Sequence, residues 1–257
     1  MHVFGITGPI GHGKSTLANA MMKLEQPSIH IETSMIISGV ANEWFATFPK
    51  ELLIDPIDYH ILNRWMADLA RVLSQQIRQV EPSALAISHE QVITDSKYYY
   101  KLFMHLNLMR QGVIPLGEAI TEANKDKHRT ILQWLGGFLV ERVDPGIWYD
   151  EIENRLKSAA KEGVKLAVVG GLRYPYDAEV IRRNGGIIIK LIRADLPERE
   201  LADITEEHRS EIKADTVIIS DAKPSALDEL VKAMFQDFIM GDLLPKYNSN
   251  DFQPLAD

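Results

Sequence analysis

The sequence predicts an α/β fold, in which a mostly parallel sheet is covered by helices on both faces. Short apolar segments alternate with segments of helical periodicity, which is typical of strands buried on both faces. A glycine-rich segment, Gly8–Ser15, separates the first apolar segment from the first helical one. Hydrophobic residues make up 46% and charged residues 25% of the 257 residues, which argues against a disordered or fibrous chain.

Five apolar segments are predicted to be strands. They are residues 3–6, 29–32, 166–169, 187–192 and 216–220. Apolar residues that recur at steps of three and four predict helices around them. These are residues 15–22, 35–45, 62–77, 98–109, 129–143, 148–161, 175–183 and 227–240. Pro175 stands where a helix begins, and Asn184-Gly185-Gly186 provides its end.

The domain organisation follows from the position of the strand segments. They continue after a proline-punctuated stretch at about 49–127, so we expect a single domain over residues 1–257. The stretch itself is interpreted as a mostly helical insertion. Residues 241–257 are rich in polar and turn residues and are expected to form a loose tail.

Charge and composition exclude several classes of function. The chain has 28 Lys and Arg residues against 36 Asp and Glu residues, a net charge of −8. It therefore lacks the broad positive field that nucleic-acid binding uses. The absence of cysteine excludes disulfides, thiolate metal ligands and cysteine nucleophiles. No apolar run is long enough to span a membrane, and no signal-peptide pattern is present, so we expect a cytoplasmic protein without membrane partners.

The most specific motif is Gly8-Pro9-Ile10-Gly11-His12-Gly13-Lys14-Ser15. It matches G-x-x-x-x-G-K-[ST] in full and lies between a predicted strand and a predicted helix, as a phosphate-binding P-loop (Walker A) must. The glycines allow backbone amides to surround phosphate oxygens, and the helix adds its positive N-terminal end. The motif thus predicts a P-loop NTPase fold with three αβα layers, in which the helical insertion serves as a lid.

The side chains of the motif have separate expected roles. Lys14 places a positive charge on the β- and γ-phosphates, and the Ser15 hydroxyl ligates Mg²⁺. Thr16 is expected on the α-phosphate side. His12 occupies a variable position of the phosphate-binding segment and is interpreted as a spacer.

A P-loop does not by itself determine the chemistry. The segment Asn124-Lys125-Asp126 resembles a GTPase base-reading motif in letters, but no apolar strand precedes it. The strand at 166–169 ends in Gly170-Gly171, whereas a motor ATPase would have an acidic residue there. Glu32 is the other candidate acid. This pattern favours a small-molecule kinase, for which substrate and metal arrive together.

Arginines are the expected partners of a second anion, because a guanidinium donates two hydrogen bonds to one phosphate. Arg173 lies just past the carboxyl end of a predicted strand, where ligands bind in open α/β sheets. Arg129 and Arg142 flank an apolar helical segment.

Four segments in the second half of the chain support this interpretation by their order and spacing. They are Arg129-x-x-Leu132-Gln133-x-Leu135-Gly136 with Arg142 and Asp144-Pro145-x-Ile147-Trp148, then Arg173-Tyr174-Pro175-Tyr176-Asp177-Ala178-Glu179, then His208-x-Ser210-Glu211, and finally Ala214-Asp215 with Leu227-x-x-Leu230. Together with the P-loop they resemble the bacteriophage-type deoxynucleoside monophosphate kinases. The resemblance covers residues 129–235 in order and the first quarter of the chain more weakly.

The resemblance implies transfer of the γ-phosphate of ATP, with Mg²⁺, to a (deoxy)nucleoside monophosphate, giving the diphosphate. It implies that Lys14, Arg129, Arg142 and Arg173 are catalytic. The acceptor side would involve Ser34, Trp44 and Asp177. A homodimer is compatible with it, and small-molecule nucleotides are the expected partners.

Two departures leave alternatives open. The family's aspartate two residues before Arg173 is Gly171 here, so its role is absent or is supplied by Asp177 or Glu32. The family's threonine after the Leu-Gly pair is Gly137. The alternatives are another small-molecule P-loop kinase, similar to dephospho-coenzyme A kinase, and a nucleotide-binding protein without catalytic activity.

Overall fold

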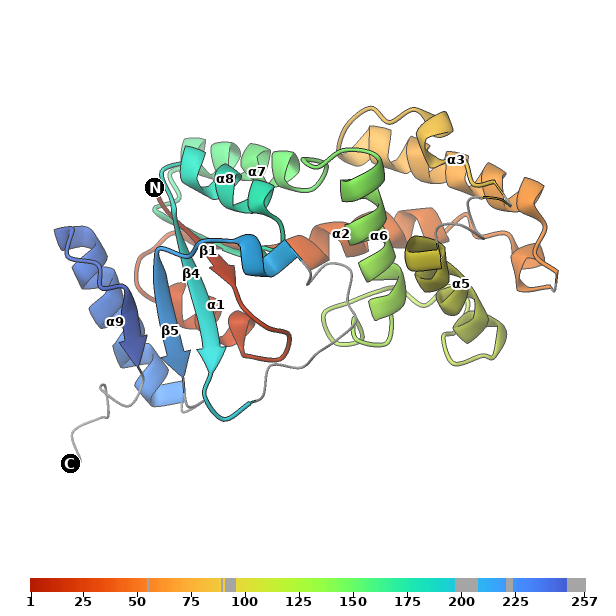
Figure 1. Cartoon of the computed structure of the whole chain (residues 1–257). Coiled ribbons are helices and arrows are strands. Elements are labelled where there is room, and N and C mark those ends of the chain that lie inside the picture. Colours follow the sequence, from red (N-terminus) through yellow and green to blue (C-terminus); the bar gives the residue numbers. More distant parts are fainter. Residues whose placement is uncertain (55, 89, 91–95, 197–207, 221–223, 249–257) are drawn as a thin grey trace. The chain divides into compact units, whose positions relative to one another are not determined.

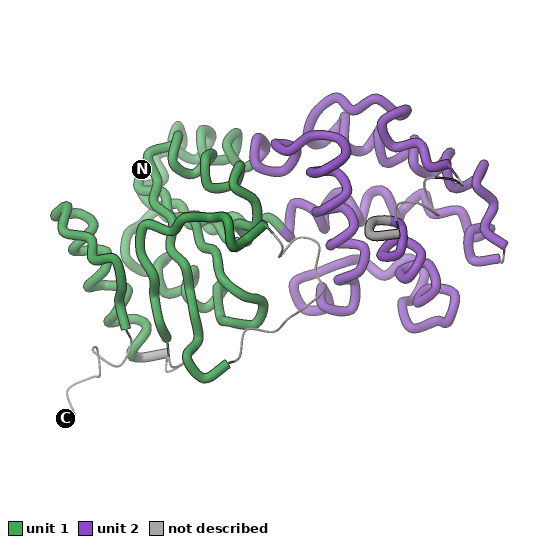
Figure 2. Tube along the Cα trace, viewed as in Figure 1, with its two compact units in different colours: residues 1–33, 152–257 green, residues 34–151 purple. Residues whose placement is uncertain are grey.

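The computed structural model of the chain describes residues 1–54, 56–88, 90, 96–196, 208–220 and 224–248. The chain forms two compact units (Figure 2). Unit 1 comprises Met1–Thr33 and Ile152–Asp257, and unit 2 comprises Ser34–Glu151. The predicted insertion at 49–127 falls within unit 2, which extends further on both sides.

Unit 1 contains a six-stranded parallel sheet within its described residues, in the order β2-β3-β1-β4-β5-β6. Its strands are β1 (His2–Thr7), β2 (Ser28–Glu32), β3 (Leu166–Gly170), β4 (Ile187–Arg193), β5 (Thr216–Ser220) and β6 (Lys246–Asn248). The first five confirm the predicted strands. β6 is an addition, formed in the segment that was expected to be a loose tail. Residues 249–257 of that tail lie outside the described residues.

Helices cover both faces of this sheet, because successive side chains of a strand point to opposite faces. Phe4 and Ile6 of β1 pack into a core with α1 (Lys14–Met21) and α9 (Pro224–Met240). On the other face, Gly5 lies against Ile181 of α8 (Pro175–Arg183). α7 (Tyr149–Lys161) lies beside α8, to which Glu153 is linked by an ion pair with Arg183 (Figure 1). This arrangement confirms the α/β fold and is consistent with three αβα layers.

The regular elements of unit 2 are all helices within its described residues, joined by turns and irregular segments. Its elements are α2 (Thr33–Phe45), which begins at the last residue of the first segment of unit 1, the 3-10 helices η1 (Lys50–Leu53) and η2 (Pro82–Leu85), α3 (Tyr59–Gln76), α5 (Ser96–Arg110) and α6 (Arg129–Arg142). The predicted helices are confirmed, and α6 continues without interruption through Gly136-Gly137.

Tryptophan side chains form the centre of the core of unit 2. Trp44 of α2 and Trp65 of α3 are stacked, with ring centroids 3.8 Å apart, and Trp134 of α6 lies 5.7 Å from Trp44. The Trp44 indole N–H donates to the Trp65 carbonyl at 2.8 Å. All three rings are fully buried, and large buried aromatic surfaces of this kind dominate the stability of a core.

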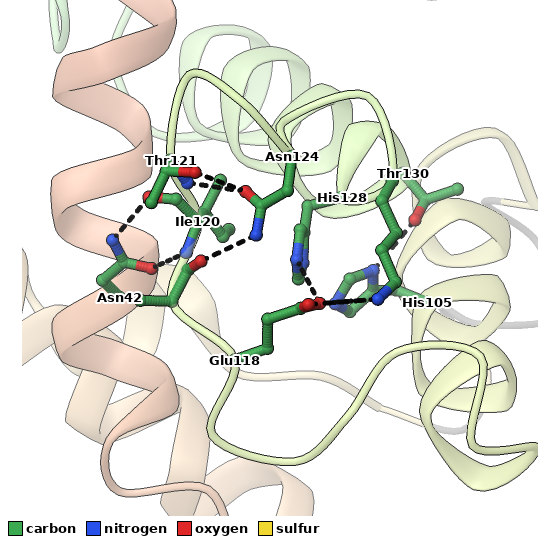
Figure 3. A network of polar contacts seen from close by, with 10 residues as sticks. Asn42, His105, Glu118, Ile120, Thr121, Asn124, His128 and Thr130 are labelled. Atoms are coloured by element: carbon green, nitrogen blue, oxygen red, sulfur yellow. Dashed lines mark hydrogen bonds and ion pairs between the residues drawn. The ribbon is translucent and has the colours of Figure 1, made fainter.

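A polar network fixes the connection between α5 and α6 (Figure 3). The Asn42 amide donates to the Ile120 carbonyl at 3.0 Å and accepts from the Ile120 backbone N–H at 2.7 Å. Asn124 accepts from the Thr121 N–H at 2.7 Å and donates to the Ala119 carbonyl at 3.0 Å. Asn124 therefore stabilises a turn, with no strand before it, in the segment whose letters resemble a GTPase motif.

Two histidines belong to the same network, His105 of α5 and His128 just before α6 (Figure 3). The His128 Nε2 contacts the Glu118 carboxylate at 3.0 Å, and the His105 Nδ1 contacts the Thr130 hydroxyl at 2.9 Å. Burial, together with a smaller effect of the neighbouring His128, lowers the pKa of His105 to about 3. The pKa of His128 is also lowered by burial, although Glu118 opposes this. The His105 ring is therefore neutral at pH 7.

Unit 2 is expected to lose stability in acid through His105. Its folded-state pKa lies below the unfolded value of 6.5, so the unfolded state binds more protons. This contribution is fully present above pH 6.5 and is lost as the pH falls toward 3, at up to about 1.4 kcal/mol per pH unit. The free energy of unfolding of the wild type, relative to His105→Asn, should therefore fall between pH 6.5 and pH 4.

Urea unfolding followed by circular dichroism measures this difference. His60→Asn is the matched control, because His60 is exposed on α3 of the same unit. A difference between wild type and His105→Asn that stays constant over this pH range would contradict the expected titration.

Candidate functional site

The carboxyl edge of the sheet contains most of the candidate residues of unit 1. β1 lies between β3 and β4. After β1 the chain builds β2 and β3 on one side of it, and it then crosses to the other side of β1 to form β4. Such a reversal of direction is where open parallel sheets bind ligands, beyond the carboxyl ends of the strands. The segments that follow β1, β2, β3 and β4 emerge at this edge because all four strands are parallel.

The Gly8–Ser15 loop follows β1 and leads into α1. Gly8, Gly11 and Gly13 all have positive φ angles, of 146°, 82° and 86°. At Gly8 a side chain is also excluded by space, since a Cβ there would overlap the backbone carbonyl of Leu191 in β4. The loop thus packs directly on the neighbouring strand, and α1 begins immediately after it at Lys14.

Two side chains hold this loop in shape. The Lys14 ammonium donates to the carbonyls of Gly8 and Pro9, both at 2.8 Å. His12 is buried, and its Nδ1 accepts a hydrogen bond from the backbone N–H of Arg193 at 3.0 Å. This contact joins the loop to the end of β4. His12 was predicted to be a spacer. In the structure its hydrogen bond with Arg193 holds the loop against the end of β4, which its position in the motif did not indicate.

Arg193 itself is engaged at the same edge. Its guanidinium forms a two-pronged ion pair with Asp195, with Nε 2.8 Å from Oδ1. This pair raises the pKa of Arg193 and lowers that of Asp195. The positive charge of Arg193 is thus neutralised beside the loop.

The segment after β3 lies beside β1. The Leu172 backbone N–H donates to the Ile6 carbonyl at 3.3 Å, and the Thr7 hydroxyl donates to the Leu172 carbonyl at 3.1 Å. Thr7 is the residue before Gly8, and Arg173 is the residue after Leu172. The structure therefore brings the half-buried Arg173 and the Gly8–Ser15 loop to neighbouring positions of one edge.

Asp177 stabilises the start of α8. Its carboxylate accepts from the backbone N–H groups of Arg173 and Tyr174, at 2.7 and 2.9 Å. Burial raises the pKa of Asp177 to about 7, against the opposing effects of these two hydrogen bonds and the charge of Arg173. These contacts account for the carboxylate as a helix cap, and its expected role on the acceptor side stays a prediction.

Two segments that carry the resemblance meet in unit 1. The ring of Tyr174, just before α8, lies 5.4 Å from the ring of His208 in the 3-10 helix η4 (His208–Glu211). The His208 imidazole in turn contacts Glu211 at 2.9 Å. The segments are more than 30 residues apart in the sequence, so their meeting could not be predicted from spacing alone.

An acidic side chain reaches the edge from β2. The Glu32 carboxylate lies over Gly170 and Gly171, where a Cβ at Gly171 would be 3.2 Å from its Oε1. Gly171 also has a φ angle of 84°, which favours glycine. The position at which the family has an aspartate is thus covered by the carboxylate of a neighbouring strand.

The other candidate residues belong to unit 2. Arg129 is the first residue of α6 and pairs with Asp126 at 2.6 Å, whereas Arg142 is its last residue and is exposed. Ser34 lies in the first turn of α2, where its carbonyl accepts from the Ser38 hydroxyl. Trp44 is fully buried in the aromatic core. Its contacts account for it as a core residue, and its expected role on the acceptor side stays a prediction.

Comparison with known proteins leaves the family assignment open. No protein-family model matches the chain, and no curated protein matches it at a significant level. No helix of the described residues has both the length and the hydropathy needed to cross a membrane. In the same part of the chain, no three His, Asp or Glu side chains gather as ligands of a metal ion.

The packing of Gly8 gives a prediction with an internal control. Gly8→Ala and Gly11→Ala both place a side chain at positive φ, but only the first meets backbone, since nothing lies within 4 Å of a Cβ at Gly11. Gly8→Ala should lower the free energy of unfolding by roughly 1–3 kcal/mol more than Gly11→Ala. Urea unfolding of both variants measures the difference. Equal losses would show that the loop does not pack on Leu191.

Proposed function

We propose that the protein is an ATP-dependent phosphotransferase that converts a (deoxy)nucleoside monophosphate to the diphosphate, on a P-loop NTPase fold. The observation that carries the proposal is the Gly8–Ser15 loop, which links β1 to α1 at the carboxyl edge of a parallel sheet. Its sequence matches the phosphate-binding motif in full, and its three glycines have the positive φ angles that turn backbone amides inward.

The loop and α1 supply what the triphosphate of ATP needs. The backbone amides at the N-terminus of α1 favour negative charge, and Lys14 begins that helix. The Lys14 ammonium rests on carbonyls of its own loop, so a phosphate that enters the loop replaces these neutral acceptors with charged ones. The interactions of Lys14 with the β- and γ-phosphates are therefore stronger than the two carbonyl hydrogen bonds that they replace.

The second substrate carries a phosphate too, and the arginines are assigned to it. Arg173 lies next to the loop through the contacts of Leu172 with β1. Arg129 and Arg142 are assigned to the acceptor phosphate on the resemblance alone. Ser34 and Trp44 are assigned to the acceptor side on the same basis. An oxygen of the acceptor phosphate forms a bond to the γ-phosphorus, and the bond from that phosphorus to the bridging oxygen of ADP breaks. The charges that develop are stabilised by Lys14 and Arg173.

The residues at this edge also fit Mg²⁺, which prefers oxygen ligands and is commonly held by few protein groups together with phosphates. Ser15, the second residue of α1, offers a hydroxyl, and Glu32 offers a carboxylate on the neighbouring side of the sheet. When bound, Mg²⁺ supplies positive charge to the phosphate oxygens. The protein's own part is to orient ATP and the acceptor, with the helical insertion at about 49–127 proposed as the lid that excludes water.

Lys14→Ala tests the proposal. We expect the rate of ADP formation from ATP and Mg²⁺ to fall at least roughly 100-fold, because a preorganised cation at the transferring phosphate is lost. The measurement uses a panel of deoxy- and ribonucleoside monophosphates as acceptors. Lys23→Ala is the control, because Lys23 is an exposed residue just past α1 that pairs with Asp228.

The outcomes separate the proposed function from its alternatives. Turnover with one or more monophosphates, lost in Lys14→Ala but kept in Lys23→Ala, would support the proposal and identify the acceptor. ATP binding without turnover on any nucleotide would favour another acceptor or a nucleotide-binding protein without catalysis. Near-normal turnover of Lys14→Ala would contradict the role of Lys14.

A further inference from the structure

We infer that Glu32 is the acidic residue that positions Mg²⁺ with ATP in this protein, in place of the aspartate that position 171 lacks. This inference rests on the proposed function and assigns one further residue to the same site. It is carried by the way in which the Glu32 side chain lies across the end of β3.

The register of three strands brings Glu32 toward the Gly8–Ser15 loop. Glu32 pairs with Gly170, and Gly170 pairs with Ile6, so these residues form one row across the sheet. β2 lies two strand spacings, roughly 10 Å, from β1. Because the Glu32 side chain reaches over β3, its carboxylate lies at the end of β3, the strand next to β1.

The glycine pair is what makes this reach possible. A Cβ at Gly170 would overlap the Glu32 Oε2 and lie 3.0 Å from its Cδ, and a Cβ at Gly171 would lie 3.2 Å from Oε1. Any side chain at Gly170 would thus displace the carboxylate. The two glycines at 170 and 171 therefore leave space for the Glu32 carboxylate, which places an acidic group from β2 at the end of β3.

Neighbouring groups hold the carboxylate in a defined place. The Thr33 hydroxyl donates to the Gly170 carbonyl at 3.0 Å, which fixes the residue after Glu32 to the end of β3. The His30 Nε2, two residues earlier on the same face of β2, lies 3.4 Å from the Glu32 Oε2. The Glu32 side chain is 17% exposed, so it is largely buried but keeps some contact with solvent.

Two other acids near this edge, within the described part of the chain, have partners of their own. Asp177 accepts two backbone hydrogen bonds at the start of α8 and is buried. Asp195 forms its ion pair with Arg193. The sequence left Asp177 and Glu32 open as replacements for the aspartate. Of these two, Glu32 is the one whose carboxylate lies against Gly171.

The test compares ATP binding in Mg²⁺ with ATP binding in EDTA, by calorimetry and without an acceptor. Glu32→Gln keeps the size and the hydrogen-bond acceptor of the side chain but removes its charge. We expect ATP affinity in Mg²⁺ to fall by roughly 10- to 100-fold, as for other residues that orient a metal from its outer shell. ATP affinity in EDTA should stay unchanged. Glu162→Gln, an exposed residue just past α7, is the matched control.

A purely structural Glu32 would give a different pattern. Glu32→Gln would then lower the free energy of unfolding while the ratio of ATP affinities in Mg²⁺ and EDTA stayed at its wild-type value, and this would overturn the inference. If the wild type bound ATP in neither condition, the proposed function itself would fail. If the wild type bound and transferred phosphate but Glu32→Gln matched it, the inference alone would fail.

A reciprocal variant, Glu32→Ala with Gly171→Asp, tests the equivalence of the two positions. Aspartate is among the few residues that tolerate the φ angle of Gly171. We expect the variant to regain Mg²⁺-dependent ATP binding that the single Glu32→Ala variant lacks. A folded reciprocal variant whose ATP affinity is the same in Mg²⁺ and EDTA would overturn the equivalence.

Discussion

The register of the four strands β2, β3, β1 and β4 is the constraint on which the candidate site depends. Ile6 is level with Gly170 of β3 and Ile189 of β4, and Gly170 is level with Glu32 of β2. β2, β3 and β1 therefore end within one residue of the same level, whereas β4 continues three residues past the level of Thr7. A shift by one residue would turn each side chain to the opposite face. The positions of the Gly8–Ser15 loop, Glu32 and Arg173 are therefore all set by the backbone hydrogen bonds that pair these strands.

Preorganisation is the main property that this edge provides. The turned backbone of the Gly8–Ser15 loop is held by contacts within the protein, because Gly8 packs on Leu191, His12 accepts from the Arg193 N–H, and Lys14 donates to two loop carbonyls. A ligand that enters a preformed loop does not have to order it, which lowers the free-energy cost of binding. Two cations of this edge have acceptors within the protein, Lys14 on the carbonyls of Gly8 and Pro9 and Arg193 on Asp195.

The strands and helices of both units could be predicted from the spacing of apolar residues, and the Gly8–Ser15 loop from its motif. Contacts between residues far apart in the sequence could not be predicted in this way. β6 has only three residues, with a single buried tyrosine, and carries no apolar pattern. The contact of His12 with Arg193 joins residues 181 positions apart. The reach of Glu32 over Gly171 needs the strand order, which places β3 between β2 and β1. Such features depend on which strands are neighbours, and the sequence pattern does not contain that information.

The distribution of tryptophan has an optical consequence. The four tryptophans of the chain, at 44, 65, 134 and 148, all belong to unit 2. Emission excited at the red edge of protein absorption therefore reports on that unit alone, whereas unit 1, with the Gly8–Ser15 loop, contributes none of it. The stacked indoles of Trp44 and Trp65 are shielded from water, so their emission should lie at short wavelength and move to longer wavelength when the helices separate. The chain thus contains its own spectroscopic label for one of its two compact units.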